Sequence, residues 1–237
     1  GVAEGFAASV GNSRFANELD KFRKVPYMER YYQIKERLEE CKKESVKNRK
    51  VRYVALVSWD EFEQNQALFD MGIDIEPEKE RVPVTQIQVN FDSLTGSFAI
   101  PSRVNCDEPW HTFSFAIDEK GVVLINDDGI AQQMIDRIAQ TKHWKNPSLE
   151  RFLYDFLEGI VIGDLIELEK YEKEMERMED RILKNDMDMV MERLVDIRSE
   201  LLDLKAHYEQ LIDVSQEFEE NENRFFDSKN LRFFRLF

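Results

Sequence analysis

Carboxylates are the residues of this sequence with the clearest capacity for chemistry. The 237 residues include 48 Asp and Glu against 33 Lys and Arg, which gives a formal net charge of −15. Hard cations such as Mg²⁺ prefer oxygen ligands and retain several waters, so one or two carboxylates from separate elements are enough to hold such an ion. Spacing along the chain therefore cannot single out a cation site. The charge does make cations the natural small partners, and it disfavours nucleic acid or an anionic membrane surface.

Most of the acidic excess lies in one segment. Residues 149–222 contain 23 acidic and 9 basic residues, a balance of −14. The simplest interpretation is a solvated helix face, and attraction of cations is the alternative. Asp127 and Asp128 precede a periodic apolar segment and are interpreted as helix caps rather than as ligands.

The sequence contains none of the common catalytic motifs that would indicate an enzyme. The sequence contains no phosphate-binding glycine loop, no HExxH and no GxSxG. The three histidines, His111, His143 and His207, are far apart and are interpreted as structural. Cys41 and Cys106 form no CxxC pair, which argues against a zinc finger or a disulfide framework and favours a reducing compartment. We predict that the chain is not an enzyme.

The elements that would position the carboxylates begin with a mixed sheet. Residues 1–25 are interpreted as a flexible arm. The segment 27–44 is compatible with a helix, but its residues 31–34 are equally compatible with a short strand, and periodicity does not decide between them. Residues 51–58 predict a strand, after which Ser58 caps a helix that runs to about Met71.

Two antiparallel hairpins are predicted next, each from period-two alternation on both sides of a turn. The first has a turn at 92–96, and the second has Gly121 in its turn, where a positive φ is expected. The strands are 84–91 with 97–100, and 110–117 with 122–125. A helix over 129–141 then covers the sheet, so that 26–146 form an α/β domain.

A long helical hairpin should follow the stop-and-cap signal at 146–148. Two helices, about 149–184 and 187–220, are separated only by Asn185 and Asp186 and should pack antiparallel, each on the order of 50 Å long. The pair is expected to project from the body. The predicted seam consists of apolar residues spaced three and four apart: Leu165, Leu168, Tyr171, Met175, Met178 and Ile182, facing Met187, Met191, Leu194, Ile197, Leu201, Leu204, Tyr208, Leu211 and Phe218.

The end of the chain predicts a new helix. Asp227 and Ser228 can cap it, and residues 229–237 are basic and strongly apolar. So short an apolar helix should either pack on the hairpin or belong to an oligomer. The predicted divisions of the chain are 1–25, 26–146, 147–226 and 227–237.

This order of parts resembles the cytoplasmic region of CorA-type magnesium and divalent cation transporters. The residues that carry the resemblance best are FLYDFL (152–157), DLIELE (164–169) and RSELLDLK (198–205), which look like the paired outer helices of that family. The resemblance implies a homopentamer in the cell membrane, with this part on the cytoplasmic side. It also implies that a stalk helix beginning near Ser228 continues beyond Phe237 into a membrane segment, where the Gly-Met-Asn signature of the family would follow.

The resemblance further implies a regulatory Mg²⁺ between a carboxylate of the α/β domain and one on the stalk of a neighbouring subunit. The acids that match these places are Asp70 or Asp74 near the first helix, and Asp227. The chain departs from the family pattern in the stalk, because residues 231–235 contain no acid. We therefore predict an ion-sensing, gating domain of a Mg²⁺ channel-transporter.

Two alternatives stay open. Zinc or cobalt transport is one, since sequence does not distinguish the divalent cation. The other is a soluble adaptor whose coiled-coil arm recruits partner helices. No stretch of about 18 consecutive apolar residues is present, so the chain itself is expected to be soluble and to meet the membrane only through further helices.

Overall fold

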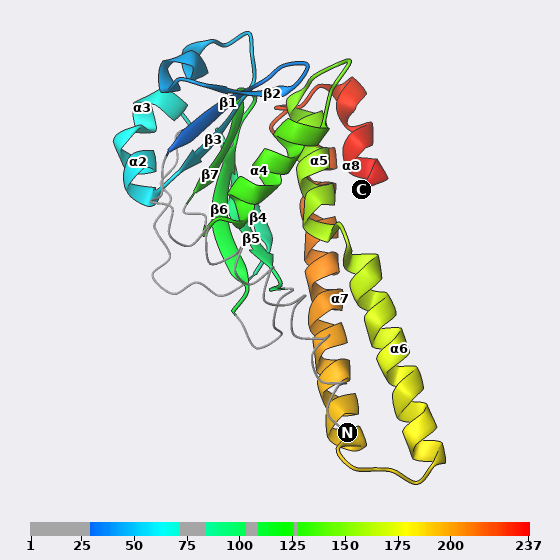
Figure 1. Ribbon diagram of the computed structural model, residues 1–237. Helices are drawn as coiled ribbons and strands as arrows, with labels where there is room; N and C mark the ends of the chain where they lie inside the picture. The colour runs from blue at the N-terminus through cyan, green and yellow to red at the C-terminus, as the bar shows by residue number, and fades with distance from the viewer. Residues whose placement is uncertain (1–28, 72–83, 103–108, 126–127) are drawn as a thin grey trace.

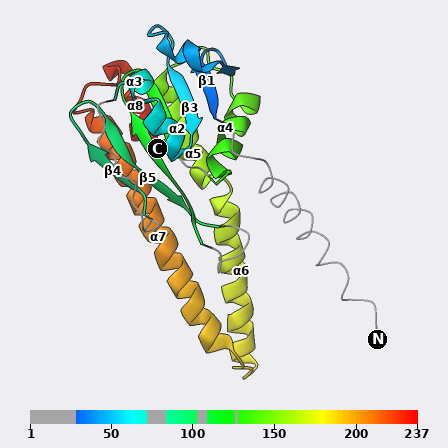
Figure 2. The ribbon, with the colours of Figure 1, turned by 90° about the vertical axis from the view of Figure 1, so that its left-hand side faces the viewer.

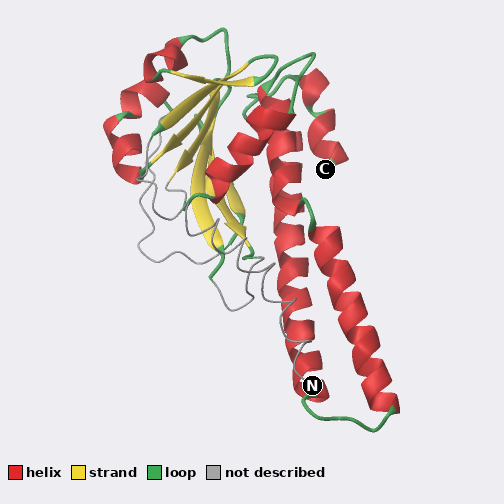
Figure 3. Ribbon diagram, viewed as in Figure 1, coloured by secondary structure: helices red, strands yellow, loops and turns green. Residues whose placement is uncertain are grey.

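A seven-stranded mixed sheet with helices on both faces forms the body of the chain, and a helical hairpin projects from it (Figures 1 and 3). The computed structural model describes residues 29–71, 84–102, 109–125 and 128–237, so the predicted N-terminal arm lies outside the described residues. The strands are β1 (Arg30–Ile34), β2 (Leu38–Cys41), β3 (Tyr53–Val57), β4 (Gln86–Val89), β5 (Leu94–Ile100), β6 (His111–Ile117) and β7 (Gly121–Ile125). The helices are η1 (Lys43–Lys47), α2 (Trp59–Gln64), α3 (Gln66–Phe69), α4 (Ile130–Thr141), α5 (Leu149–Val161), α6 (Asp164–Leu183), α7 (Val190–Glu220), η2 (Ser228–Asn230) and α8 (Arg232–Leu236).

The strand order is β2-β1-β3-β7-β6-β5-β4, and β3 with β7 is the one parallel pair among the described strands. Both predicted hairpins, β4 with β5 and β6 with β7, are confirmed as antiparallel pairs. The fold class predicted from the sequence is therefore confirmed.

Alternation along the central strands gives the sheet two buried faces. Val54 and Leu56 of β3 enter a large apolar core beneath α4, α5, α7 and α8. Tyr53, Ala55 and Val57 point the other way, into a smaller core under α2 and α3. Because side chains alternate with period two, a continuous apolar strand indicates burial on both faces.

Several local predictions hold at the level of single residues. The open choice over 27–44 resolves in favour of strands, because β1 and β2 pair with each other there. The Ser58 side chain accepts a hydrogen bond from the Glu61 backbone N–H at 3.2 Å, and the Glu61 carboxylate accepts one from the Ser58 N–H at 2.8 Å. This reciprocal capping box starts α2 as expected.

Two turn predictions were wrong. Leu94 to Gly96 belong to β5 rather than to the turn, which is therefore shorter. Gly121 has no positive φ. A Cβ at Gly121 would instead lie 2.4 Å from the carbonyl oxygen of Tyr53 on the parallel neighbour β3, so glycine is needed there for close strand approach.

The single helix predicted over 149–184 is broken in two. Ile162 is extended and Gly163 has φ +83°, a conformation that glycine adopts at little cost, so α5 ends and α6 begins with a change of direction. The second helix is confirmed as α7. At 31 residues α7 is about 46 Å long, whereas α6 has 20 residues and is about 30 Å long, shorter than predicted.

The predicted seam between α6 and α7 exists over its centre. Met178 packs with Val190 and Ile197 in a small apolar cluster that also includes Tyr171, Met175, Leu194 and Leu201. Leu165, Ile182, Met187 and Met191 are exposed, so their assignment to the seam was wrong. The break at Gly163 resets the helical phase of α6, which explains why Leu165 misses its partner helix.

The two halves of α7 have different surroundings. Its first half packs on α6, and its later half runs along β4, where Leu211, Val214 and Phe218 are buried in the large core (Figure 2). Of the two places predicted for the C-terminal apolar cluster, the structure shows packing on the hairpin, since Phe234 lies against Phe218 at a ring separation of 5.1 Å.

Replacing Gly121 by Ala tests the close contact with Tyr53. The added methyl meets backbone rather than a movable side-chain end, so we expect Gly121→Ala to lower the free energy of unfolding by about 1 to 3 kcal/mol. Urea denaturation measures this change. Gly159→Ala is the control, because Gly159 lies within α5 and the nearest atom to an added Cβ is the Met134 methyl at 3.5 Å, so that variant should be neutral or more stable by up to about 1 kcal/mol. Equal effects in both variants would contradict the account of Gly121.

Candidate functional site at the root of the helical hairpin

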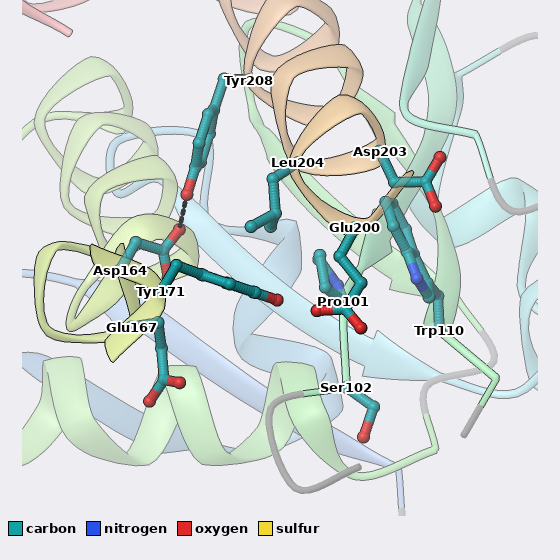
Figure 4. Close-up of a pocket in the computed structure, with 10 residues that line it drawn as sticks. All are labelled: Pro101, Ser102, Trp110, Asp164, Glu167, Tyr171, Glu200, Asp203, Leu204 and Tyr208. Atoms are coloured by element: carbon teal, nitrogen blue, oxygen red, sulfur yellow. Dashed lines mark hydrogen bonds between the residues drawn. The ribbon is translucent and has the colours of Figure 1, made fainter. Parts of the chain in front are cut away.

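A cleft opens where the start of α6, the middle of α7 and the adjoining ends of β5 and β6 meet (Figure 4). Three of its described residues are aromatic, four are acidic and none is basic. The residues are Pro101, Ser102, Trp110, Asp164, Glu167, Tyr171, Glu200, Asp203, Leu204 and Tyr208. The cleft therefore combines apolar walls with concentrated negative charge.

The positions of the four cleft acids follow from helix periodicity and from the helix break at Gly163. Asp164 and Glu167 are three residues apart on α6, and Glu200 and Asp203 are three apart on α7, so each pair shares one helix face. The Tyr208 hydroxyl donates a hydrogen bond to Asp164 Oδ2 at 2.8 Å and ties α7 to the first turn of α6 (Figure 4). The two acidic pairs consequently border the same hollow.

Arg193 links the two helices just beyond the cleft. Its guanidinium donates to both oxygens of Glu174 on α6, at 2.7 and 3.0 Å, and to Glu200 Oε1 at 2.8 Å. These bonds hold the pKa of Glu174 below its usual value and raise the pKa of Arg193. The second oxygen of Glu200, Oε2, is buried and accepts no hydrogen bond from the described residues.

The cleft suits positive charge more than a directly ligated metal. Four carboxylates within one hollow create a negative potential that concentrates cations. Within the described parts of the chain, no group of three or more His, Cys, Asp or Glu residues is close enough to hold a metal ion. The arrangement therefore fits a hydrated or an organic cation.

Asp70 lies away from this cleft, on the other side of the sheet. It ends α3 with φ +49°, and its side chain is 74% exposed. Lys120 in the β6–β7 turn donates to the Asp70 carbonyl at 3.2 Å and lies 3.7 Å from its carboxylate. The same ammonium pairs with Asp118 at 3.1 Å.

Asp118 is buried, unlike Asp70. Its Oδ1 accepts hydrogen bonds from the backbone N–H groups of Lys120 and Gly121, at 2.8 and 3.2 Å. Burial raises the pKa of this carboxyl to about 6, against the opposing effect of Lys120. Asp118 thus anchors the turn whose lysine contacts Asp70.

Asp227 begins the C-terminal segment, as predicted. Its side chain accepts a hydrogen bond from the Lys229 backbone N–H at 3.1 Å, and the Lys229 ammonium lies 3.3 Å away. These contacts lower the pKa of Asp227. The backbone N–H of Asp227 donates to the carboxylate of Glu150 at 2.6 Å, which fixes the segment to the start of α5.

The predicted ligands do not meet within one chain. Asp70 follows α3 on one face of the sheet, and Asp227 precedes α8 on the other (Figure 1). Asp74 lies outside the described residues. A site that uses Asp70 and Asp227 together would therefore need two copies of the chain.

The sequence matches one family model, over residues 83–236, and that family is described as CorA-like Mg²⁺ transporter protein. The chain belongs to this CorA-like family. The match includes the cleft and Asp227, whereas Asp70 lies before it. No curated protein sequence matches the chain.

Solved structures of a CorA transporter and of a ZntB cytoplasmic domain share the fold. The complete structure of the CorA magnesium transporter from Methanocaldococcus jannaschii has 15% identity and a TM-score of 0.63, over 89% of this chain and 68% of that chain. The soluble domain of the same protein has 16% identity and a TM-score of 0.63, over 89% and 86%. The ZntB cytoplasmic domain from Vibrio parahaemolyticus RIMD 2210633 has 10% identity and a TM-score of 0.53, over 87% and 84%.

The family model confirms the family that the sequence predicted, and the similar structures confirm the fold class. Sequence identities of 10 to 16% show that the fold is shared, but they do not show that the residues of a site are shared. Among the helices of the described residues, none combines the length and the apolar character needed to cross a bilayer.

Sequence reasoning missed two buried acids of this CorA-family chain. Asp155 is fully buried in α5, where it accepts a hydrogen bond from Trp144 Nε1 at 2.7 Å and pairs with Arg151 and Lys142 at 3.2 and 3.3 Å. Glu150 is also buried. The available signal was an acid on the apolar face of an amphipathic helix with basic residues close in sequence. The four cleft acids were missed because a heptad pattern draws attention to apolar positions.

The three histidines make ion-pair or ring-packing contacts within the chain. His111 pairs with Asp128 at 2.5 Å, which joins β6 to the segment before α4. The N-cap of α4 is Gly129, so the prediction that Asp128 is the cap was wrong by one residue, and Asp127 lies outside the described residues. His207 is buried against Trp110 and Tyr208. His143 is exposed, 3.6 Å from Glu36.

The raised pKa of Asp118 predicts a pH dependence of stability. The native state binds this proton more tightly than the unfolded chain does, so the stabilisation is fully present below about pH 4 and is lost as pH rises through about 6. Wild type should therefore gain stability relative to Asp118→Asn between pH 7 and pH 4, on the order of 2 kcal/mol. Urea denaturation across this range measures the difference. Asp92→Asn, which removes an exposed acid from the other hairpin turn, is the control for loss of a turn carboxylate. A flat difference for Asp118→Asn would contradict the assignment.

Proposed function

We propose that this chain forms the cytoplasmic, ion-sensing part of a divalent cation transporter, with Mg²⁺ as the first candidate ion. The observation that carries the proposal is the family match over residues 83–236, whose description names Mg²⁺ transport. Similarity to the soluble domain of a CorA protein supports it. A role as transporter component rather than enzyme follows from the same family, and transport itself would use membrane segments that the described residues do not provide.

The sensing site would lie between copies of the chain in a homo-oligomer, which we propose to be a pentamer. Asp70 and Asp227 are both exposed and lie on opposite faces of the sheet, so each is available to the complementary carboxylate of a neighbour. Mg²⁺ keeps most of its waters and needs few protein ligands, which suits two carboxylates from different subunits.

The lysines beside these acids bear on affinity. Lys120 is 3.7 Å from the Asp70 carboxylate and Lys229 is 3.3 Å from that of Asp227, so a bound ion must compete with two ammonium groups. Weak binding follows, as a sensor of abundant ions requires. A cation that binds one assembled state better than others stabilises that state, and its loss releases the hairpins to move.

Light scattering of the chain with millimolar Mg²⁺, and then with EDTA, tests the proposal. We expect Mg²⁺ to increase the mass toward that of an oligomer and EDTA to reverse the change. Parallel titrations with Zn²⁺ and Co²⁺ distinguish the divalent cation, because the proposal expects Mg²⁺ to act at the lowest concentration.

Conservative variants make the test specific. Asp70→Asn and Asp227→Asn each keep a polar side chain that can hold the local turn, and each should raise the Mg²⁺ concentration at half-assembly by about tenfold; Asp74→Asn is the third variant. Asp180→Asn, an exposed acid in α6, is the matched control and should behave as wild type. A mass that changes neither with Mg²⁺ nor with EDTA would contradict the proposal. It would favour the alternative that the chain is a soluble adaptor whose coiled-coil arm recruits partner helices.

A further inference from the structure

The segment that contains η1 carries an exposed basic surface on a strongly acidic chain. Residues 42–52 include six Lys and Arg against one Glu, although the whole chain has a formal net charge of −15. Four of these basic residues are exposed, and together they are called the basic surface: Lys42, Lys47, Arg49 and Lys50. Positive charge is thus concentrated at one place on an otherwise acidic molecule.

The turn that presents the basic surface is held by core and local contacts. Val46 of η1 is buried in the smaller core together with Phe69 of α3. The Asn48 side chain accepts a hydrogen bond from the Lys50 backbone N–H at 3.1 Å, and the Asn48 carbonyl accepts one from the Val51 N–H at 3.2 Å. The cationic side chains therefore project from a fixed turn.

The charge of this segment is little neutralised within its own chain. In the part of the chain that the structure describes, Lys43 is the one basic residue of 42–52 with an ion pair, at 3.9 Å from Glu29. Arg52 donates a hydrogen bond to the carbonyl oxygen of Arg49 at 3.2 Å, which leaves its charge unpaired. Because neighbouring like charges repel one another, an acidic partner would be attracted by several groups at once.

The end of α7 presents the complementary charge. Glu217, Glu220 and Glu222 are together called the acidic surface, and the last two of them are exposed. Burial, and then repulsion by Glu220 and Glu222, raises the pKa of Glu217, so the three carboxylates lie close enough to repel one another. Glu219 differs from them, because Arg235 pairs with it at 2.7 Å.

The two surfaces lie on opposite faces of the sheet and do not meet within one chain. Val46 of η1 packs in the core under α2 and α3, whereas Phe218 of α7 packs in the large core on the other face (Figure 1). Two different surfaces that attract each other between copies form a heterologous contact, which closes into a ring when its rotation permits.

We propose that the basic surface docks on the acidic surface of a second copy of the chain. The inference rests on the homo-oligomer of the proposed function and names a surface that joins its copies by charge complementarity. Nucleic acid and anionic membranes fit less well, because the net charge of −15 repels them over the rest of the molecule.

Both surfaces adjoin the acids of the proposed sensing site. On one side, η1 packs against α3, the helix that Asp70 ends. On the other side, the Asn221 side chain bonds to the backbone of Phe226 at 2.9 and 3.0 Å, which holds Asp227 beside the end of α7. A single arrangement of the copies therefore suits both the contact between Asp70 and Asp227 and the contact between the basic and acidic surfaces.

Sedimentation equilibrium of charge-reversal variants, at fixed Mg²⁺ and low ionic strength, tests the proposal. Lys47→Glu with Lys50→Glu, and separately Glu220→Lys with Glu222→Lys, should each raise the chain concentration at half-assembly at least about tenfold, because like charges then face each other. All four substitutions in one chain exchange the signs of the two surfaces and should return half-assembly to within about threefold of wild type. Added NaCl should weaken the wild-type assembly.

Two controls make the test specific. Lys145→Glu with Lys173→Glu makes the same change of net charge at exposed positions outside the basic surface and should assemble as wild type. Vesicles that contain phosphatidylserine, pelleted with the chain, test whether the basic surface binds anionic lipid instead, and we expect no binding. Thermal unfolding of each variant verifies that the fold is retained.

The outcomes separate this contact from the proposed ion sensing. Assembly that responds to Mg²⁺ but is the same in wild type and in both charge-reversal variants would overturn the contact and leave ion sensing intact. Charge-dependent assembly that responds to neither Mg²⁺ nor EDTA would support the contact and contradict ion sensing. A monomer in every condition, no recovery in the fourfold variant, or vesicle binding that Lys47→Glu with Lys50→Glu abolishes would overturn the contact.

Discussion

The buried carboxylate of Asp155 is the interaction on which the arrangement of the helices depends. It has no exposed surface, and its charge is balanced by Lys142 from the end of α4, Arg151 from α5 and the indole N–H of Trp144 from the segment between them. A buried charge is tolerated only when it is paired, and loss of one partner typically costs about 3 to 5 kcal/mol. The direction of α5 is thereby fixed against α4. Because Arg151 also stacks on Phe233 of α8, at 5.3 Å, the same network orients the C-terminal segment.

The position of the helical hairpin depends on the anchored helix α5. Once α5 is fixed, the turn at Gly163 sets where α6 begins, and the Tyr208 to Asp164 hydrogen bond holds α7 beside it. Beyond that point the pair is held by one small apolar cluster and by Arg193. Few buried apolar contacts imply lower local stability, so among the described residues the distal hairpin should open locally more readily than the central sheet does.

Local patterns predicted the elements, and non-local contacts decided the rest. The alternation in β3 and the capping signal at Ser58 act within a few residues, so the sequence alone was sufficient for them. The helix break at Gly163 was missed because the apolar periodicity on both sides of it resembles one continuous helix. Gly121 was assigned to a positive φ because its contact with Tyr53 joins strands nearly 70 residues apart, which no local pattern reveals.

For the candidate sites, too, local features could be predicted from the sequence, whereas non-local contacts could not. Asp227 was predicted correctly as a cap, because capping is local, but its attachment to Glu150 depends on folding. The cleft draws its residues from four elements, and the opposite placement of Asp70 and Asp227 follows from sheet topology rather than from sequence. For these reasons the family was recognisable from the order of the parts, while the geometry of its sites was not.

Hydrogen exchange of the backbone amides, with and without Mg²⁺, tests most directly the claim that an anchored body carries an ion-responsive hairpin. In the absence of Mg²⁺, the account predicts slow exchange in β3, β7 and the later half of α7, and faster exchange in α6 and the first half of α7. Addition of Mg²⁺ should slow exchange in α6, in the first half of α7 and around Asp227, and leave the central strands unchanged. Uniform exchange along α7, with no effect of Mg²⁺ on any segment, would contradict the account.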